Sequence, residues 1–261
     1  MNFGLKGRIA LVLGAGGGLG SAIAKTLAAE GANIALADLD PKALEPIAAE
    51  LAAAGVNCIS LQWDLADAAA IESNIAAIEA KLGPVDILIN NTGGPPPTPA
   101  AGQSAALWQK SFESMVLSVI QITDRVLPGM RSRGWGRIVT STSSGVVAPI
   151  ANLGISNALR LSLVGWSKTL AREVAADGVT ANIILPGRIA TPRISFLDQA
   201  KADRENRPVA EVTAESTGTI PMKRYGTPQE YANTVAFLAS DLASYITGSV
   251  IRVDGGLIVS I

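Results

Sequence analysis

Short apolar runs alternate with longer alanine-rich segments along most of this chain, and this alternation most limits the fold that it can adopt. The runs are apolar at nearly every position, as in strands covered on both faces, and a helix between each pair favours parallel pairing. The predicted strands are Arg8–Leu13, Asn33–Ala37, Asn57–Gln62, Val85–Asn90, Arg137–Ser143, Thr180–Leu185 and Ser249–Val253.

The segments between these strands have the helical period. We expect one doubly wound layer of seven parallel strands with helices on both faces, an α/β fold of the Rossmann type. No linker, repeat or low-complexity segment interrupts the pattern, so residues 1–261 are expected to form a single domain. The predicted helices are Gly18–Glu30, Pro41–Ala54, Ala66–Lys81, Ala105–Ser132 and Leu153–Ala176.

The segment Arg188–Met222 departs from this rhythm. It is polar and charged, contains three prolines, and follows the carboxyl end of a predicted strand. Long insertions at this place are usually functional loops. We therefore predict a substrate loop or lid over about 188–222, with a disordered surface excursion as the alternative.

Composition and charge exclude several classes of function. The 21 basic residues are balanced by 22 acidic ones without a run of Lys or Arg, so nucleic acid is not an expected partner. Cys58 is the only cysteine and is interpreted as core filler in a reducing compartment. The first apolar run is too short for a signal peptide or a membrane span, which predicts a cytoplasmic protein with no membrane partner. The chain has no histidine, so neither a metal site nor imidazole chemistry is expected.

A glycine-rich turn, "LGAGGGLG" (13–20), directly follows the first predicted strand and opens the first helix. Glycine there permits a positive φ and a close approach of the backbone to a pyrophosphate, whose charge the helix N-terminus stabilises. Asp38 ends the second strand, where a carboxylate binds the hydroxyls of an adenosine ribose. The same carboxylate repels a 2′-phosphate, and neither 15–17 nor Leu39 supplies a basic residue. NAD is therefore predicted rather than NADP.

The spacing Gly14-x-x-x-Gly18-x-Gly20 resembles that of the short-chain dehydrogenase/reductase family, and the resemblance extends over almost the whole chain. "WDLAD" (63–67), "NNTG" (90–93), "LPGRIAT" (185–191) and "VDGG" (253–256) are similar to further family motifs, although Leu13 and Thr92 depart from the usual residues. The cofactor-binding residues that follow are Gly14, Gly16, Gly17, Gly18, Leu19, Gly20, Asp38, Asp64, Leu65, Asn91, Thr92, Gly93, Pro186, Gly187, Ile189 and Thr191.

The resemblance also implies an active site of serine, Tyr-x-x-x-Lys and an asparagine on the preceding helix. In that family the tyrosine transfers the carbonyl proton, the lysine lowers the pKa of the tyrosine and holds the nicotinamide ribose, and the serine polarises the carbonyl. "GRIVTSTSS" (136–144) places the serine at Ser143, and the flanking sequence places the tyrosine at Ser156, the lysine at Arg160 and the relay asparagine at Met115. Three of the four positions have changed.

These replacements weaken or redirect a reductase. Ser156 and Arg160 are one helical turn apart, so both can face one pocket. Arginine is a fixed cation and a poor proton donor, and serine is a weaker acid than tyrosine. The candidate catalytic residues are therefore Ser143, Ser156 and Arg160. A further hypothesis is that Arg160, Arg188 and Arg193 converge on a carboxylate or phosphate of the ligand, beside the "GGPPPTP" loop (93–99).

Three functions stay open at this point. The first is an NAD(H)-dependent oxidoreductase similar to 3-oxoacyl-acyl-carrier-protein reductases but with a non-standard active site. Its substrate would be the carbonyl or alcohol of a small molecule, either anionic or neutral. The second is a catalytically silent dinucleotide- or ligand-binding protein with the same fold, and the third is a lyase or isomerase. The family resemblance also implies a homodimer or homotetramer, paired through Ala105–Ser132 and Leu153–Ala176.

Overall fold

The computed structural model describes residues 2–261 and contains one seven-stranded parallel sheet in the order β3-β2-β1-β4-β5-β6-β7. The order reverses between β1 and β4, as in doubly wound folds. Both the fold class and the seven predicted strands are confirmed. Their observed bounds are β1 Ile9–Leu13, β2 Asn33–Asp38, β3 Cys58–Gln62, β4 Ile87–Asn90, β5 Gly136–Ser141, β6 Val179–Pro186 and β7 Val250–Val253.

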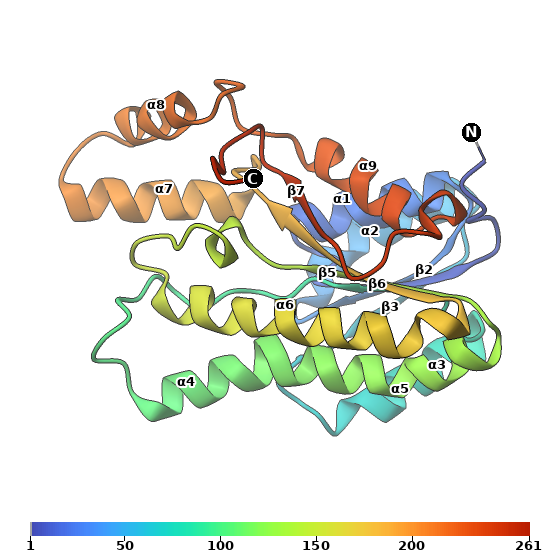
Figure 1. The fold of residues 1–261 in the computed structure, drawn as a ribbon. Coiled ribbons are helices and arrows are strands. Elements are labelled where there is room, and N and C mark those ends of the chain that lie inside the picture. The colour runs from blue at the N-terminus through green and yellow to red at the C-terminus, as the bar shows by residue number, and fades with distance from the viewer. Residues whose placement is uncertain (1) are drawn as a thin grey trace.

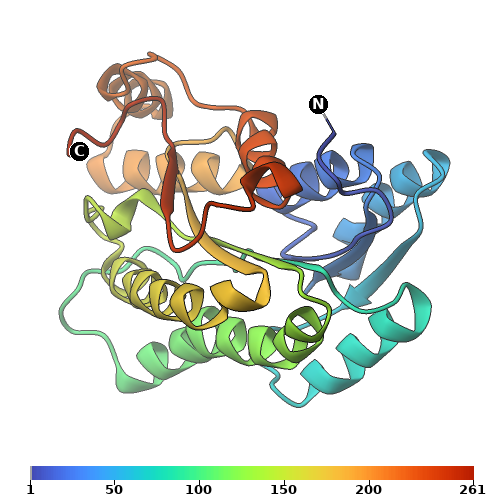
Figure 2. The same cartoon turned by 45° about the vertical axis from the view of Figure 1, so that its right-hand side comes forward.

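Helices cover both faces of the sheet (Figures 1 and 2). On one face lie α1 (Gly18–Ala29), α2 (Pro41–Ala53) and α9 (Pro228–Leu238), and on the other lie α3 (Ala70–Lys81), α5 (Ser118–Ser132) and α6 (Gly154–Val174). Two apolar cores result, one on each side of the sheet.

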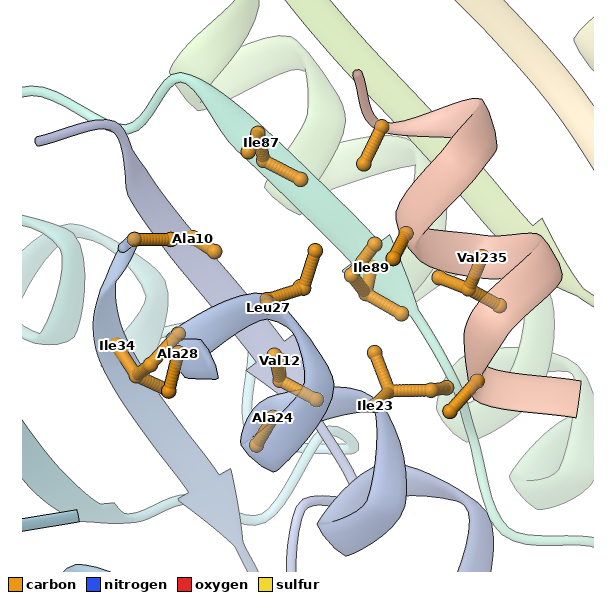
Figure 3. Packing of buried hydrophobic residues seen from close by; sticks show 14 of the residues in the cluster. Ala10, Val12, Ile23, Ala24, Leu27, Ala28, Ile34, Ile87, Ile89 and Val235 are labelled. Carbon is orange, nitrogen blue, oxygen red and sulfur yellow. The ribbon is translucent and has the colours of Figure 1, made fainter. Parts of the chain in front are cut away.

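Alternation along the strands assigns side chains to these two cores. In β1, Val12 packs with α1 and α9, whereas Leu11 packs on the opposite face with α3 and α5. Figure 3 shows the first core, where Ile23 and Leu27 of α1 lie against β1 and β4, with Val235 of α9 beside them. Each fully buried Leu, Ile or Val stabilises the fold by about 1.5–3 kcal/mol, so the cores hold the strand ends in place.

Helix α3 begins at Ala70, four residues after the predicted start at Ala66. Two aspartate side chains explain the difference. Asp64 accepts a hydrogen bond from the Ala66 N–H at 2.9 Å, and Asp67 accepts one from the Ala69 N–H at 3.0 Å. Such side-chain bonds stabilise turns in competition with the first turn of a helix.

The predicted helix Ala105–Ser132 is present but is not regular throughout. It consists of α4 (Ala105–Phe112), a π-helical turn over Glu113–Leu117 and α5. A π-helical turn contains one extra residue, and such turns are frequent at functional sites. Met115 lies within this one.

The segment 188–222 is not a disordered excursion. It contains α7 (Pro192–Glu205) and α8 (Val209–Thr219), which stand off the layered body after β6 (Figure 1). Asp198 of α7 is buried and is central to this segment. Its carboxylate forms an ion pair with Arg188 at 2.8 Å and accepts hydrogen bonds from the Tyr225 hydroxyl at 2.6 Å and the Thr213 hydroxyl at 3.5 Å. These contacts join both helices to the strand end that precedes them.

No helix among residues 2–261 is both long enough and apolar enough to cross a membrane.

Candidate dinucleotide and substrate site

The glycine-rich turn and the "NNTG" segment meet where the sheet order reverses, because β1 and β4 are neighbouring strands. The Asn91 side-chain amide donates to the Leu13 carbonyl at 3.2 Å and to the Gly14 carbonyl at 3.4 Å. Ligands of open α/β sheets bind in the crevice at this point, beyond the carboxyl ends of the strands.

The turn after β1 has the geometry that a pyrophosphate requires. Gly14 has a φ of +61°, which L side chains rarely adopt, and a Cβ at Gly20 would lie 2.1 Å from the Gly14 carbonyl oxygen. Helix α1 has no side-chain cap at its N-terminus, so the N–H groups of its first turn have no side-chain acceptor. N–H groups without acceptors at a helix N-terminus, together with the helix dipole, favour an anion at such a place.

Asp38 lies at the end of β2, beside this turn. One carboxylate oxygen accepts the Gly16 N–H at 2.9 Å, and the other accepts the Asp40 N–H at 3.1 Å. The carboxylate is thus fixed next to the glycine turn, half-buried, with its remaining acceptor positions available to ribose hydroxyls.

The far side of the crevice is formed by the end of β6 and the start of α7. A Cβ at Gly18 would lie 2.9 Å from the Thr191 side chain, so Thr191 contacts the start of α1. Gly187 donates to the Val253 carbonyl at 2.9 Å, which joins the turn after Pro186 to β7, and Ile189 pairs with Gly226. The "LPGRIAT" segment and the glycine turn therefore lie side by side at the carboxyl ends of the strands.

Asp64 and Leu65 follow β3, at the adenine end that the resemblance implies. Asp64 is exposed and uses one oxygen for its own turn, and Leu65 is half-buried. At the other end, the Thr92 hydroxyl oxygen is buried without a hydrogen-bond partner in the described residues. The space around the Cβ position of Gly93 is open.

The candidate catalytic residues come from two elements. Ser143 follows the end of β5, and Ser156 and Arg160 belong to α6. Ser143 precedes a short turn of 3₁₀-helix, and its hydroxyl accepts the Gly145 N–H at 3.1 Å. Ser156 and Arg160 lie one turn apart on the buried face of α6. The Ser156 hydroxyl has no hydrogen bond to another residue among those described, so it is available to a ligand.

Arg160 reaches across the ends of β4 and β5. Its guanidinium donates to the Ser141 carbonyl at 3.3 Å, the Thr92 carbonyl at 3.2 Å and the Gly93 carbonyl at 2.9 Å. It is buried, with 8% of its surface exposed. Burial lowers the pKa of Arg160 to about 10, which the neighbouring charge of Arg193 also favours, yet the group remains a cation at neutral pH.

The structure brings together two of the three arginines of the anion hypothesis. The Arg193 guanidinium donates to the Pro95 carbonyl at 2.9 Å and lies near Gly94, as does Arg160. Arg188 is directed instead to Asp198 at 2.8 Å. Because the buried Asp198 carboxylate pairs with Arg188, only Arg160 and Arg193 are kept for the anion hypothesis.

Met115 lies in the π-helical turn and is buried against Val116, Val119 and Leu163. A thioether offers only a weak acceptor, so this position contributes packing and no useful hydrogen bond.

Two tyrosines beyond the sequence motifs lie near the site. Tyr231 of α9 is fully buried and shares a hydrogen bond of 2.8 Å with the Ser141 hydroxyl. Burial raises the pKa of Tyr231, so it is a poor proton donor. It lies in the core between α9 and the sheet, and supports the strand end whose carbonyl binds Arg160. Tyr225 binds Asp198 and belongs to the α7–α8 segment.

Comparisons with known proteins agree with this geometry. The model adh_short_C2, described as Enoyl-(Acyl carrier protein) reductase, matches residues 14–258. The 3-oxoacyl-[acyl-carrier-protein] reductase FabG of Escherichia coli K12 is 39% identical over 259 residues, covering 98% of this chain and 99% of that protein. The chain belongs to the short-chain dehydrogenase/reductase family.

Other members of the short-chain dehydrogenase/reductase family are similar along the whole chain. Nodulation protein G of Azospirillum brasilense is 39% identical over 253 residues, which are 96% of this chain and 98% of that protein. The structure of L-sorbose reductase from Gluconobacter frateurii, complexed with NADPH and L-sorbose, has a TM-score of 0.94 at 31% identity and covers 100% of both chains. Within this family framework, the present chain contains no Tyr-x-x-x-Lys, since its only tyrosines are Tyr225, Tyr231 and Tyr245.

Proposed function

We propose that this protein binds NAD(H) and transfers a hydride between the nicotinamide and a carbonyl or alcohol carbon, with Ser143, Ser156 and Arg160 in place of the family's usual acid. The observation that carries the proposal is the placement of Ser156 and Arg160. Both are buried on one face of α6, and Arg160 binds the segment Thr92–Gly93 that follows the strand beside the glycine turn.

The cofactor part of the proposal rests on the fit of the crevice to a dinucleotide. The positive φ of Gly14, the close approach at Gly20 and the uncapped start of α1 suit a pyrophosphate. Asp38 suits ribose hydroxyls and repels a 2′-phosphate, which favours NAD. The L-sorbose reductase structure holds NADPH, so preference for NAD would distinguish this chain from that relative.

The chemistry follows from what the side chains can donate. When bound, the cofactor supplies the hydride for reduction or accepts it in the reverse direction. As the new C–H bond forms, the carbonyl π electrons pass to oxygen, which gains negative charge. The Ser143 and Ser156 hydroxyls donate hydrogen bonds to that oxygen, and the Arg160 charge stabilises it. The Ser156 hydroxyl then gives its proton to the substrate oxygen, which completes the alcohol product. Ser156 regains a proton from solvent water.

The magnitudes of two general effects are compatible with activity in the absence of the tyrosine. A missing general acid costs about 10²–10⁴-fold in rate. This loss corresponds to about 3–5 kcal/mol of activation free energy. Holding the reactants in contact lowers the activation free energy by about 7–11 kcal/mol, which is more than the loss. The proposed enzyme is therefore slow but active.

A second candidate is a silent dinucleotide-binding protein, and the contacts of Arg160 favour it. Three main-chain carbonyls already bind the guanidinium, so Arg160 also serves as a structural tie between β4, β5 and α6. Met115 adds no group that could hold a relay water.

A titration with NADH and NADPH, followed by a turnover screen over ketones, aldehydes and alcohols, tests both candidates. We expect NADH to bind at least tenfold more tightly than NADPH, a difference of about 1.4 kcal/mol. Asp38→Ser should abolish or reverse this preference, because it removes the charge that repels a 2′-phosphate. Asp40→Ser, at an exposed neighbouring carboxylate that caps α2, is the matched control.

Each outcome of this titration has a definite meaning. Absence of dinucleotide binding would overturn the proposal. Tight binding of NADH without turnover of any compound would favour the silent protein over the enzyme.

The rate of ketone reduction should not depend on pH between about pH 6 and pH 8.5, because the site holds no histidine and no exposed phenol that titrates there. Since burial lowers the pKa of Arg160 to about 10, the charge of Arg160 is lost as the pH rises through that value, and the rate should then fall. Initial rates at saturating NADH and a neutral ketone measure this profile. A sigmoid step within the flat range would show that a titrating acid has been missed.

Assembly into a homodimer or homotetramer through α4, α5 and α6 stays a prediction. Phe112 on α4 and Leu161 on α6 are exposed apolar side chains on these helices, which supports it.

A further inference from the structure

Arg160 is the only buried charged residue among residues 2–261 that has no ion-pair partner. The other buried charges are Asp86, Arg137 and Asp198. Each of them is paired, Asp86 with Arg133 at 3.1 Å, Arg137 with Asp241 at 3.6 Å and Asp198 with Arg188 at 2.8 Å. Burying a charge is costly unless an opposite charge accompanies it. Within the residues that the structure describes, Arg160 is thus the one buried charge that lacks an opposite charge beside it.

A second guanidinium lies beside the first. The Cβ position of Gly94 is 3.3 Å from Arg193 Nη2 and 3.7 Å from Arg160 Nη2, so the two nitrogens are separated by no more than the sum of these distances, about 7 Å. Neither guanidinium lies within 4.0 Å of an Asp or Glu oxygen in the described residues. Two cations of like charge are therefore neighbours without a counterion.

The proline loop, residues 93–99, fixes both groups in this arrangement. Arg160 donates to the Gly93 carbonyl and Arg193 to the Pro95 carbonyl, so the same loop holds both guanidinium groups. The loop is anchored to the start of α6, since Thr98 donates to the Asn152 carbonyl at 2.8 Å and accepts from Gly154 at 3.0 Å. Prolines restrict φ, so the loop is stiff.

We propose that this arginine pair, Arg160 and Arg193, binds a carboxylate of the substrate, and that the substrate class is a small 2-oxo or 3-oxo acid or the matching hydroxy acid. This inference rests on the proposed function, because it names the substrate of the same site. Guanidinium groups bind carboxylates through paired N–H donors. Both Nη2 hydrogens of Arg160 go to Thr92 and Gly93, so its Nε–H and one Nη1–H have no acceptor among the described residues, and Arg193 donates only to Pro95.

The spacing on α6 limits the distance between the carboxylate and the reacting carbonyl. Ser156 and Arg160 are four residues apart, and side chains at this spacing are about 5–6 Å apart at Cβ. We expect a molecule that contacts both groups to carry its carboxylate close to the carbonyl, as a 2-oxo or 3-oxo acid does.

Binding of 2-oxobutanoate and 3-oxobutanoate to the full chain, measured by calorimetry with NAD⁺ present in excess, tests the proposal. Oxidised cofactor prevents turnover, so the titration reports binding alone. We expect each acid to bind at least tenfold more tightly than its methyl ester. Arg193→Gln should abolish that difference, whereas Arg204→Gln, at an exposed arginine of the same helix, should preserve it.

Two further titrations distinguish a failure of the arginine pair from a failure of the proposed function. The acids are also titrated without NAD⁺, and ADP-ribose is titrated against each variant. Acid and ester binding equally well to NAD⁺-loaded protein would overturn the arginine pair and leave the proposed function standing. If the protein binds no NAD⁺ but still binds the acids, and Arg193→Gln removes that binding, the result would support the arginine pair and overturn the proposed function.

The cofactor pyrophosphate is the competing counterion. If Arg193→Gln weakens the binding of ADP-ribose tenfold and leaves the ratio of acid affinity to ester affinity unchanged, the arginine pair binds the cofactor and the proposal is wrong. Arg160→Lys provides a second variant that keeps the buried charge and two or more of its hydrogen bonds, and it should retain a preference for acid over ester.

Discussion

The double variant Ser156→Tyr with Arg160→Lys is expected to reduce ketones about 10²–10⁴-fold faster than the natural chain. The exchange restores a phenol that can donate the carbonyl proton, and a lysine one turn away whose charge lowers the pKa of that phenol. Lysine also keeps a buried cation with several N–H donors on this face of α6.

Steady-state reduction of a ketone series by NADH measures this change, together with the dissociation constant of NADH. Ser162→Tyr is the matched control, because Ser162 is exposed on the same helix and its hydroxyl binds only the Leu159 carbonyl. That variant should leave the rate unchanged. If the double variant binds NADH normally but remains inert, Met115 or the shape of the pocket limits catalysis instead.

Replacing Asp198 by alanine is expected to lower the free energy of unfolding of the α7–α8 segment by about 3–5 kcal/mol. The carboxylate is buried, pairs with Arg188 and accepts the Tyr225 hydroxyl, so its removal leaves a partly buried cation and an unpaired hydroxyl. The loss should be local, since these partners join α7 and α8 to the end of β6 and not to the cores of the sheet.

Amide hydrogen exchange over 192–219, with urea unfolding of the whole chain, measures the effect. Asp203→Ala is the control on the same helix, because Asp203 is exposed and accepts only the Gln199 amide. Arg188→Met combined with Asp198→Leu should recover much of the loss, since it removes both charges together. Equal exchange in the Asp198→Ala and Asp203→Ala variants would contradict a central role for Asp198.

Much of the fold was accessible from the sequence because apolar periodicity reports directly on burial. The seven strands and five helical segments, which correspond to α1, α2, α3, α4 with α5, and α6, are predicted within a few residues of their bounds, apart from the start of α3. Helices α7 and α8 were missed because their surfaces are polar and face solvent, and the prolines suggested a loop. Helix α9 carried a usable signal, since Thr227-Pro-Gln-Glu230 forms a capping box with proline in the first turn.

The candidate site was accessible only in part. The glycine turn and Asp38 were identified because their spacing along the chain fixes their chemistry. The partners of Arg160 are main-chain carbonyls, which every residue has, so no side-chain pattern reveals them. The pairing of Arg188 with Asp198 also escaped prediction, because it requires α7 to be helical and to bring a carboxylate ten residues onward back to the strand end.

The π-helical turn at Glu113–Leu117 inserts one extra residue into a helix that otherwise continues from α4 into α5. Each residue of an α-helix advances the side-chain direction by about 100°. The residues before the turn are therefore rotated relative to those after it, so α4 packs on α6 whereas α5 packs on α3 and β5 as well as on α6. One inserted residue thus lets a helix that follows α6 along its length also reach α3 and β5 beyond the turn, and Met115 lies where this change occurs.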